Sequence, residues 1–322
     1  MATLCGVFAT SHSPFCYMPP ERWNEVRASR SLRADVPLDD LPANRAKAER
    51  VTRAFAALRE RLTATAPDVI VIIGDDQLEC FDFGNFPAFS VYVGEEIEGT
   101  FWARAGSPAP RARVPGHPGL GVALLTGLMR HGFDPAFSMT MPKPERGLGH
   151  AFLRPIESLT DLTTPVVPVL VNCYYAPQPT GMRCYQLGCA LSEIIAAYSG
   201  DLHVAVVGSG GLWHTPRAKD AYLDETFDQA ILGYARAGDA KGMAEYFDDY
   251  RIPAGDRSQD AGERGPGVTG MPGFGGPQGG TRETCNWIAA AGVADGTPAT
   301  IVDYVPIYAS PVGAAFAHWP AP

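Results

Sequence analysis

The sequence lacks the features that mark secreted and membrane-spanning proteins. Its seven cysteines among 322 residues are odd in number and contain no CxxC pair, so neither a disulfide framework nor a zinc knuckle is expected. No apolar run reaches the roughly 18 residues needed to cross a membrane, and the N-terminus has no basic segment followed by a long apolar one. We therefore expect reduced thiols, a cytoplasmic location and no membrane association.

Basic residues are also scarce. With 26 Lys and Arg against 35 Asp and Glu, the chain carries a net charge of −9 and has no run of basic residues interleaved with aromatic ones. This argues against nucleic acid as a partner. Hydrophobic residues make up 46% of the chain, which is enough for a sizeable core. A soluble enzyme that acts on a small molecule is the starting hypothesis.

Short apolar runs alternate with helical patterns along the chain. The runs are rich in β-branched residues and end in polar or glycine-rich segments; they cover residues 4–10, 69–73, 166–171 and 204–207. Apolar residues at helical spacing predict helices over residues 43–64, 184–197 and 218–237. The alternation predicts a single α/β domain over residues 1–322, with a central mixed sheet flanked by helices.

A long segment rich in glycine and proline, residues 253–280, precedes the last predicted helix at residues 284–291. Ordered loops of this length often serve as lids or oligomer contacts, and a mobile connection explains the composition equally well.

Polar residues follow three of the predicted strands. In open α/β sheets, ligands bind beyond the carboxyl ends of the strands. His12 follows the first run, and the second leads into a polar segment at residues 74–81. Residues 208–213 form a glycine turn that matches neither GxGxxG nor GxSxG, and they deliver His214 from a strand end, as suits an acid or base catalyst. A structural histidine or a turn cap is the alternative at each position.

Two further residues fit chemical roles. His150 lies between glycines and an apolar pair, where an imidazole can have a pKa suited to proton transfer, although a turn cap explains it too. Thr281 is a plausible N-cap that places Glu283 in the first turn of the last helix, where the helix dipole favours a carboxylate. Two histidines or their equivalents plus one carboxylate is also the arrangement of non-haem Fe(II) sites.

Taken together, these segments resemble the class III extradiol ring-cleavage dioxygenases of the LigB type. The resemblance rests on an ordered set of segments at residues 11–14, 74–81, 149–155, 166–172, 208–216 and 283–287. It implies that His12 and Glu283 are ligands of Fe(II), and that His150 and His214 flank the substrate as base and acid, in either order. It further implies a small aromatic substrate, O2 as co-substrate and a homo-oligomer.

One residue departs from the family pattern, which has Asp-His followed by Phe four residues after the histidine. Asp76 and Phe81 match, but Gln77 replaces the histidine. Asp76 is not expected to be the substitute ligand, because it corresponds to the aspartate already present in the pattern. Gln77 could bind metal through its amide oxygen, and Glu79 could supply a carboxylate on the same face if the strand continues. Either change should weaken iron binding or shift the metal preference.

The leading hypothesis is Fe(II)-dependent extradiol cleavage of a catechol-type ring, with a ring carboxylate held by Arg146, Arg264 or Arg282. One alternative is a hydrolase or lyase that uses zinc or no metal in the same pocket. Another is a non-catalytic partner subunit with a degenerate metal site, and the retention of three histidines and one glutamate argues against it.

Overall fold

The computed structural model describes residues 1–100, 111–215, 218–252 and 275–321. Its strands are β1 (Thr3–Thr10), β2 (Val69–Gly74), β3 (Phe89–Tyr92), β4 (Glu96–Thr100), β5 (Arg111–Pro115), β6 (Ala136–Ser138), β7 (Val166–Val171), β8 (His203–Ser209), β9 (Thr300–Ile307) and β10 (Val312–Trp319). Eight of them form one mixed sheet in the order β6-β3-β7-β2-β8-β1-β10-β9, and β4 pairs with β5 in a separate small sheet.

The centre of the large sheet is parallel. Strands β7, β2, β8 and β1 run in the same direction. At one edge β10 is antiparallel to β1 and β9 is antiparallel to β10, and near the other edge β3 is antiparallel to β7. Because parallel strands end at the same side of a sheet, the segments that follow β1, β2 and β8 lie together. All four predicted strands are confirmed within one or two residues.

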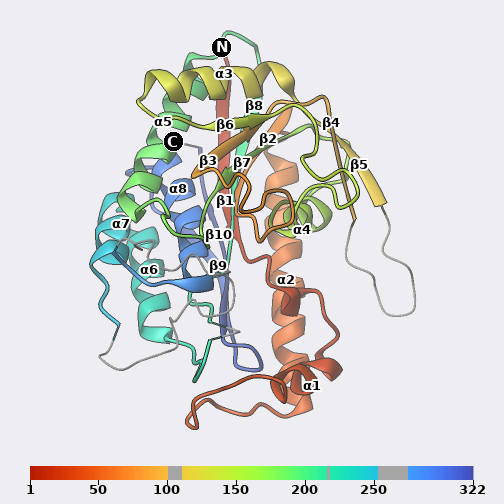
Figure 1. Cartoon of the computed structure of the whole chain (residues 1–322), viewed down its shortest axis with the longest axis vertical. Coiled ribbons are helices and arrows are strands. Elements are labelled where there is room, and N and C mark those ends of the chain that lie inside the picture. Colours follow the sequence, from red (N-terminus) through yellow and green to blue (C-terminus); the bar gives the residue numbers. More distant parts are fainter. Residues whose placement is uncertain (101–110, 216–217, 253–274, 322) are drawn as a thin grey trace.

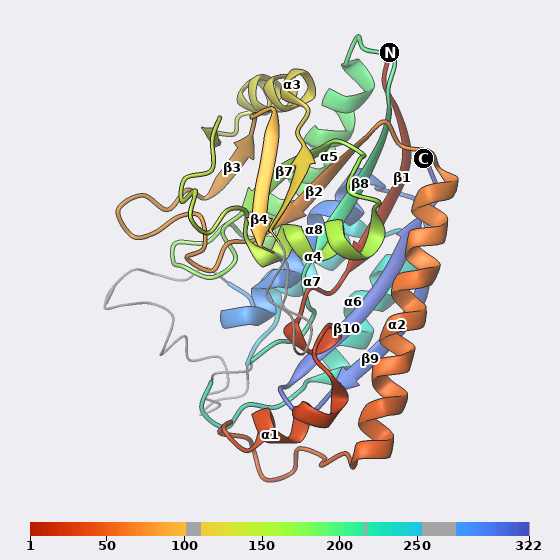
Figure 2. The same ribbon diagram turned by 90° about the vertical axis from the view of Figure 1, so that its right-hand side faces the viewer.

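Helices cover both faces of this sheet (Figures 1 and 2). They are α1 (Trp23–Arg27), α2 (Leu41–Ala64), α3 (Pro118–Arg130), α4 (His150–Leu159), α5 (Gly181–Ala197), α6 (Glu225–Ala237), α7 (Ala240–Asp249) and α8 (Thr284–Val293). Helices α2 and α4 pack on one face, and α5 and α8 pack on the other. The predicted α/β fold with a central mixed sheet between helices is therefore confirmed.

The strands at the centre bury both of their faces. Along β2, Val71 and Ile73 belong to the core that includes α5 and α8, whereas Ile70 and Ile72 belong to the core that includes α2 and α4. Side chains alternate along a strand, so two cores require apolar residues at every position. This explains why the strand is a continuous apolar run in the sequence.

Three elements predicted from the sequence either differ from the structure at their ends or lie partly outside the described residues. The helix predicted from residue 218 begins instead at Glu225, because the Asp224 side chain caps it by accepting a hydrogen bond of 3.0 Å from Phe227 N. The last helix is confirmed, but the Thr281 cap is wrong, because residues Gly279–Glu283 form a 3₁₀ turn before the helix. Most of the predicted long loop, residues 253–274, lies outside the described residues.

All seven cysteines are free thiols, as predicted. Among the described ranges, none of the helices combines the length and the apolar character needed to span a membrane.

Candidate metal centre and active-site cavity

One cavity of about 740 Å³ collects most of the sequence-predicted site residues. It lies at the segments that follow β1, β2 and β8, as expected for an open α/β sheet. Six of the predicted metal-binding and catalytic residues line it: His12, Gln77, Glu79, His150, His214 and Glu283.

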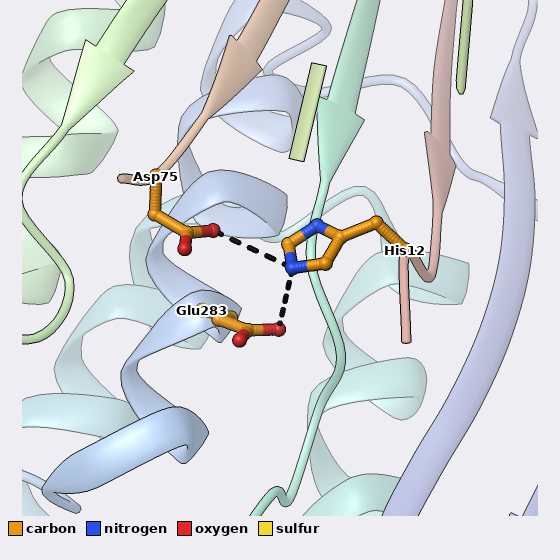
Figure 3. A group of neighbouring side chains, drawn as sticks. All are labelled: His12, Asp75 and Glu283. Carbon is orange, nitrogen blue, oxygen red and sulfur yellow. Dashed lines mark ion pairs between the residues drawn. The ribbon is translucent and has the colours of Figure 1, made fainter. Parts of the chain in front are cut away.

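Three buried side chains converge beside this cavity, His12, Asp75 and Glu283 (Figure 3), and the first and last of them line it. His12 Nε2 lies 3.3 Å from Glu283 Oε2 and 3.7 Å from Asp75 Oδ1. Donor atoms about 2.1 Å from a shared ion are separated by about 3 to 3.6 Å. The distance to Glu283 lies within this range and the distance to Asp75 lies just above it, so a small side-chain adjustment would suit a common metal ion. Asp75, which follows β2 directly, is not among the metal ligands predicted from the sequence.

Hydrogen bonds determine which nitrogen of His12 carries the proton. The Ser209 hydroxyl donates to the main-chain oxygen of Ala151, so its oxygen accepts from His12 Nδ1 at 3.0 Å. Nε2 then carries a lone pair, and within the described part of the chain it makes no hydrogen bond. Only a cation or a second ring proton relieves the repulsion between that lone pair and two buried carboxylates. The residues therefore fit a divalent metal ion.

The two carboxylates of this group have opposite pKa shifts. Burial, together with the charge of nearby Glu283, raises the pKa of Asp75 well above its usual value. Burial also acts to raise the pKa of Glu283, but the electrostatic attraction of the His12 and His214 imidazoles outweighs it and holds that pKa below its usual range. Two carboxylates in one buried site thus disfavour each other's negative charge, and a bound cation would offset that repulsion.

Glu283 is held by donors from two other segments. The Tyr174 hydroxyl donates to Oε1, and the main-chain N–H of Gly211 donates to Oε2 at 2.8 Å. Gly210 allows this approach, because a Cβ atom there would lie 2.6 Å from the main-chain oxygen of Glu283. Tyr174 was not predicted; the only available signal was its place just after the apolar run that becomes β7.

Gln77 lies beside this group as a hydrogen-bond donor. Its Nε2 atom is 2.9 Å from the Tyr174 hydroxyl and 3.4 Å from both Asp75 Oδ2 and Glu283 Oε1. Carboxylates only accept hydrogen bonds, so they draw the amide nitrogen toward them. Gln77 thus lies at the site, but its amide nitrogen, and not its amide oxygen, faces the candidate metal ligands. Binding a metal through its amide oxygen would require the amide to turn.

Glu79 occupies a different place from the one predicted. Strand β2 ends at Gly74, so the premise that an extended strand carries Glu79 to the metal is wrong. Instead, Glu79 Oε2 lies 2.8 Å from His150 Nδ1. Burial acts to raise the pKa of Glu79, but the His150 charge and hydrogen bonds outweigh it and lower that pKa. Asp76 accepts hydrogen bonds from the N–H groups of residues 80 and 81, consistent with the expectation that it is not a ligand.

The two predicted catalytic histidines both reach the cavity. His150 is the first residue of α4, and its ring lies edge-on to the His12 ring at a centroid distance of 4.9 Å. His214 follows the glycine turn after β8, and its main-chain N–H donates to the Thr281 hydroxyl at 3.0 Å. Thr281, expected to cap a helix, therefore helps to place His214.

The three predicted substrate-binding arginines have different environments. Arg146 lines the cavity and is exposed. Arg282 is fully buried, and its guanidinium donates to main-chain oxygens of Pro179, Gly275 and Pro277, so its predicted role as a substrate contact is contradicted. Arg264 lies outside the described residues.

Comparison with known proteins identifies the family of the chain. The family described as "Catalytic LigB subunit of aromatic ring-opening dioxygenase" matches residues 34–256. Two relatives, the 2,3-dihydroxyphenylpropionate/2,3-dihydroxicinnamic acid 1,2-dioxygenases of Escherichia coli strains 55989 and K12 DH10B, are 31% identical over 191 residues. That region is 58% of this chain and 56% of each relative, so the match spans little more than half the length of these relatives.

A crystal structure of an uncharacterized protein from Escherichia coli K12 aligns with 98% of this chain and 99% of its own, at 13% identity and a TM-score of 0.49. The family match does not include His12 or Glu283, which the structure brings to the matched segments. The chain belongs to the family of the catalytic LigB subunit of aromatic ring-opening dioxygenases.

Proposed function

We propose that the chain is a metal-dependent dioxygenase that opens the ring of a dihydroxylated aromatic substrate with O2. The observation that carries this proposal is the lone pair of His12 Nε2 facing Asp75 and Glu283 at a cavity, in a chain of this family. The relatives are named for 2,3-dihydroxylated aromatic acids, which supports a catechol-type substrate.

Fe(II) is the proposed metal, held by His12, Asp75 and Glu283. When bound, iron would bring the diol and dioxygen together and exchange electrons with both. Gln77 and Tyr174 would keep the Glu283 carboxylate in place by donating hydrogen bonds to it. The extradiol position of the cut follows from the family resemblance.

Proton transfer would fall to His150 and His214. Both rings line the cavity. In this proposal one of them accepts a proton from a substrate hydroxyl, and the other donates a proton as the ring opens. The contact between Glu79 and His150 Nδ1 leaves Nε2 as the nitrogen that would meet substrate, which favours His150 as the base.

The cavity wall supports an aromatic substrate. Phe15, Met18, Leu148 and Leu153 provide apolar surface beside the metal group. Arg146, at the same cavity, is the proposed partner of a ring carboxylate or carboxylated side chain.

The test is anaerobic reconstitution with Fe(II), followed by metal analysis and oxygen-uptake measurements with catechols, protocatechuate, gallate and 2,3-dihydroxyphenylpropionate. We expect about one iron per chain and one O2 consumed per ring opened, with a visible absorbance from the product. A matched His12→Ala variant should bind no iron and consume no oxygen. Protein that binds no iron and consumes no oxygen with any of these substrates would refute the proposal.

A hydrolase or lyase that uses zinc in the same pocket is the second candidate. The observation in its favour is Gln77, which leaves His12 as the only imidazole in a metal group otherwise made of carboxylates. Turnover by the zinc-loaded protein without oxygen would identify it.

We also propose a homo-oligomer, from the family resemblance, and a cytoplasmic location, from the seven free thiols. Sedimentation analysis tests the former.

A further inference from the structure

Glu79 completes the first turn of helix α4. The cap position of this helix is Gly149, which has no side chain to accept a hydrogen bond from the first turn. The Glu79 carboxylate takes that role, because its two oxygens lie 3.3 and 3.2 Å from the main-chain nitrogen of His150. Unpaired N–H groups at a helix start need acceptors, and the helix dipole favours a negative one.

The same carboxylate determines the orientation of the His150 ring. Glu79 Oε2 lies 2.8 Å from Nδ1, and because a carboxylate only accepts, Nδ1 carries the proton. The other ring nitrogen, Nε2, is directed away from Glu79. The His150 side chain is 21% exposed and lines the cavity, so the ring is both held by Glu79 and accessible to a ligand.

Several local features bring Glu79 to this position. The Asp76 carboxylate accepts hydrogen bonds from Cys80 N at 2.7 Å and Phe81 N at 3.1 Å, which closes the turn around Glu79. Leu78, the residue before Glu79, has a φ of 67°, which is uncommon for a residue with a side chain and is typical of functional sites. At Gly149, a Cβ atom would lie 2.7 Å from Glu79 Oε2, so a side chain there would displace the carboxylate from this position.

We propose that Glu79 is a positioning residue for His150, which holds the ring with its Nδ1 proton on the carboxylate and presents Nε2 to the substrate. This proposal rests on the proposed function, in which His150 exchanges a proton with a substrate hydroxyl. It also explains why a glutamate that lies near the metal group is not one of its ligands.

The first test needs no substrate. In protein labelled with ¹⁵N-histidine, the ring signals of His150 can be assigned by their loss in a His150→Gln variant. We expect the tautomer with the proton on Nδ1 in the natural protein, and a mixture of tautomers in Glu79→Ala. A natural protein with the proton on Nε2, or a Glu79→Ala variant with an unchanged spectrum, would overturn the proposal whether or not the protein is a dioxygenase.

The second test separates positioning from metal binding. In Glu79→Gln we expect kcat to fall roughly 10- to 100-fold, as for other residues that orient a functional histidine, with KM changed less than about threefold. Iron affinity, measured by titration, should stay the same. A loss of iron affinity would show that Glu79 is a metal ligand. An unchanged kcat would show that Glu79 does not position His150. Either result would overturn the proposal. Glu49→Gln, an exposed charge change on α2, is the matched control.

Discussion

The Gln77 amide nitrogen donates a hydrogen bond of 2.9 Å to the hydroxyl oxygen of Tyr174. That hydroxyl donates in turn to Glu283, so the glutamine that stands where the family has a histidine acts on a candidate metal ligand through a tyrosine. Gln77 therefore supports a candidate metal ligand instead of being one. The third candidate ligand beside His12 and Glu283 is Asp75, two residues earlier in the chain.

Tyr174→Phe removes the hydroxyl that holds Glu283 Oε1. We expect the affinity for Fe(II) to fall by about tenfold or more, as is typical when a residue that orients a metal ligand is changed. Isothermal titration under anaerobic conditions measures it. Tyr185→Phe, which removes a hydroxyl bonded to Asp295 on the surface, should leave the affinity unchanged. Equal affinities in all three proteins would exclude the role of Tyr174.

Gln77→His restores the family pattern. An imidazole at this position adds a nitrogen donor of the kind that iron favours, so we expect tighter iron binding, with oxygen uptake retained or increased. Gln77→Ala is the control, because it removes the amide without adding a donor and should not tighten binding. A loss of iron or activity in Gln77→His would mean that the surroundings of the glutamine are adapted to another task.

Asp75→Asn removes one charge from the metal group. We expect metal affinity to fall at least about tenfold, because a carboxylate ligand becomes a neutral amide. The metal-free variant should be as stable as the natural protein or more stable, since asparagine is neutral without a proton, whereas the raised pKa of Asp75 costs folding free energy at neutral pH. Metal titration and urea unfolding together distinguish this outcome from simple misfolding. Asp249→Asn, at an exposed site, should change neither quantity.

Arg146→Gln tests the anionic end of the substrate. If Arg146 pairs with a substrate carboxylate, KM for carboxylated catechols should rise by about tenfold, a typical contribution of one charge-assisted hydrogen bond. KM for unsubstituted catechol should not change. Steady-state oxygen uptake with both substrates measures the two values, and a parallel rise in both would show that Arg146 is not specific for the carboxylate.

Asp228→Asn should change how stability depends on pH. Asp228 is fully buried, accepts hydrogen bonds from Trp213 N at 2.6 Å and Tyr304 Oη at 2.7 Å, and burial raises its pKa to about 8. Between about pH 4 and pH 8 the unfolded chain has lost this proton while the folded chain keeps it. The free energy of unfolding of the natural protein therefore falls by up to about 1.4 kcal/mol for each unit by which the pH rises.

An asparagine at position 228 has no such proton. Urea unfolding at pH 5 and at pH 7.5 should therefore show the variant gaining stability relative to the natural protein as pH rises, by about 3 kcal/mol at most. The exposed variant Asp201→Asn serves as the control. Parallel pH dependences of Asp228→Asn and the natural protein would contradict the raised pKa.

The strands and the place of the site could be predicted from the sequence because buried parallel strands are short, uninterrupted apolar runs. The residues after them, His12 and His214, were identified from those ends alone, and Glu283 was identified from the helix start and the family pattern. These arguments need only local patterns and the rule that parallel strands end together.

The remaining site residues depend on backbone geometry that the sequence does not reveal. Alternation along an extended strand would carry Glu79 to the metal group, but the chain leaves the sheet after Gly74 and Leu78 has a positive φ. Tyr174 contacts Glu283 only because two distant segments meet. The environment of Arg282 could not be predicted either. Its guanidinium donates hydrogen bonds to main-chain carbonyl groups in the interior, and the sequence alone does not distinguish such an arginine from one that faces solvent.

The Ser209 hydroxyl joins two parts of the site that belong to different elements. It accepts from the metal-facing histidine, His12, and donates to the main chain of α4, the helix that begins with His150. The electron pair that His12 offers to a metal and the placement of the proposed proton carrier therefore depend on the same hydroxyl group. A serine that contacts neither metal nor substrate would thus set the alignment between the redox centre and the acid–base machinery.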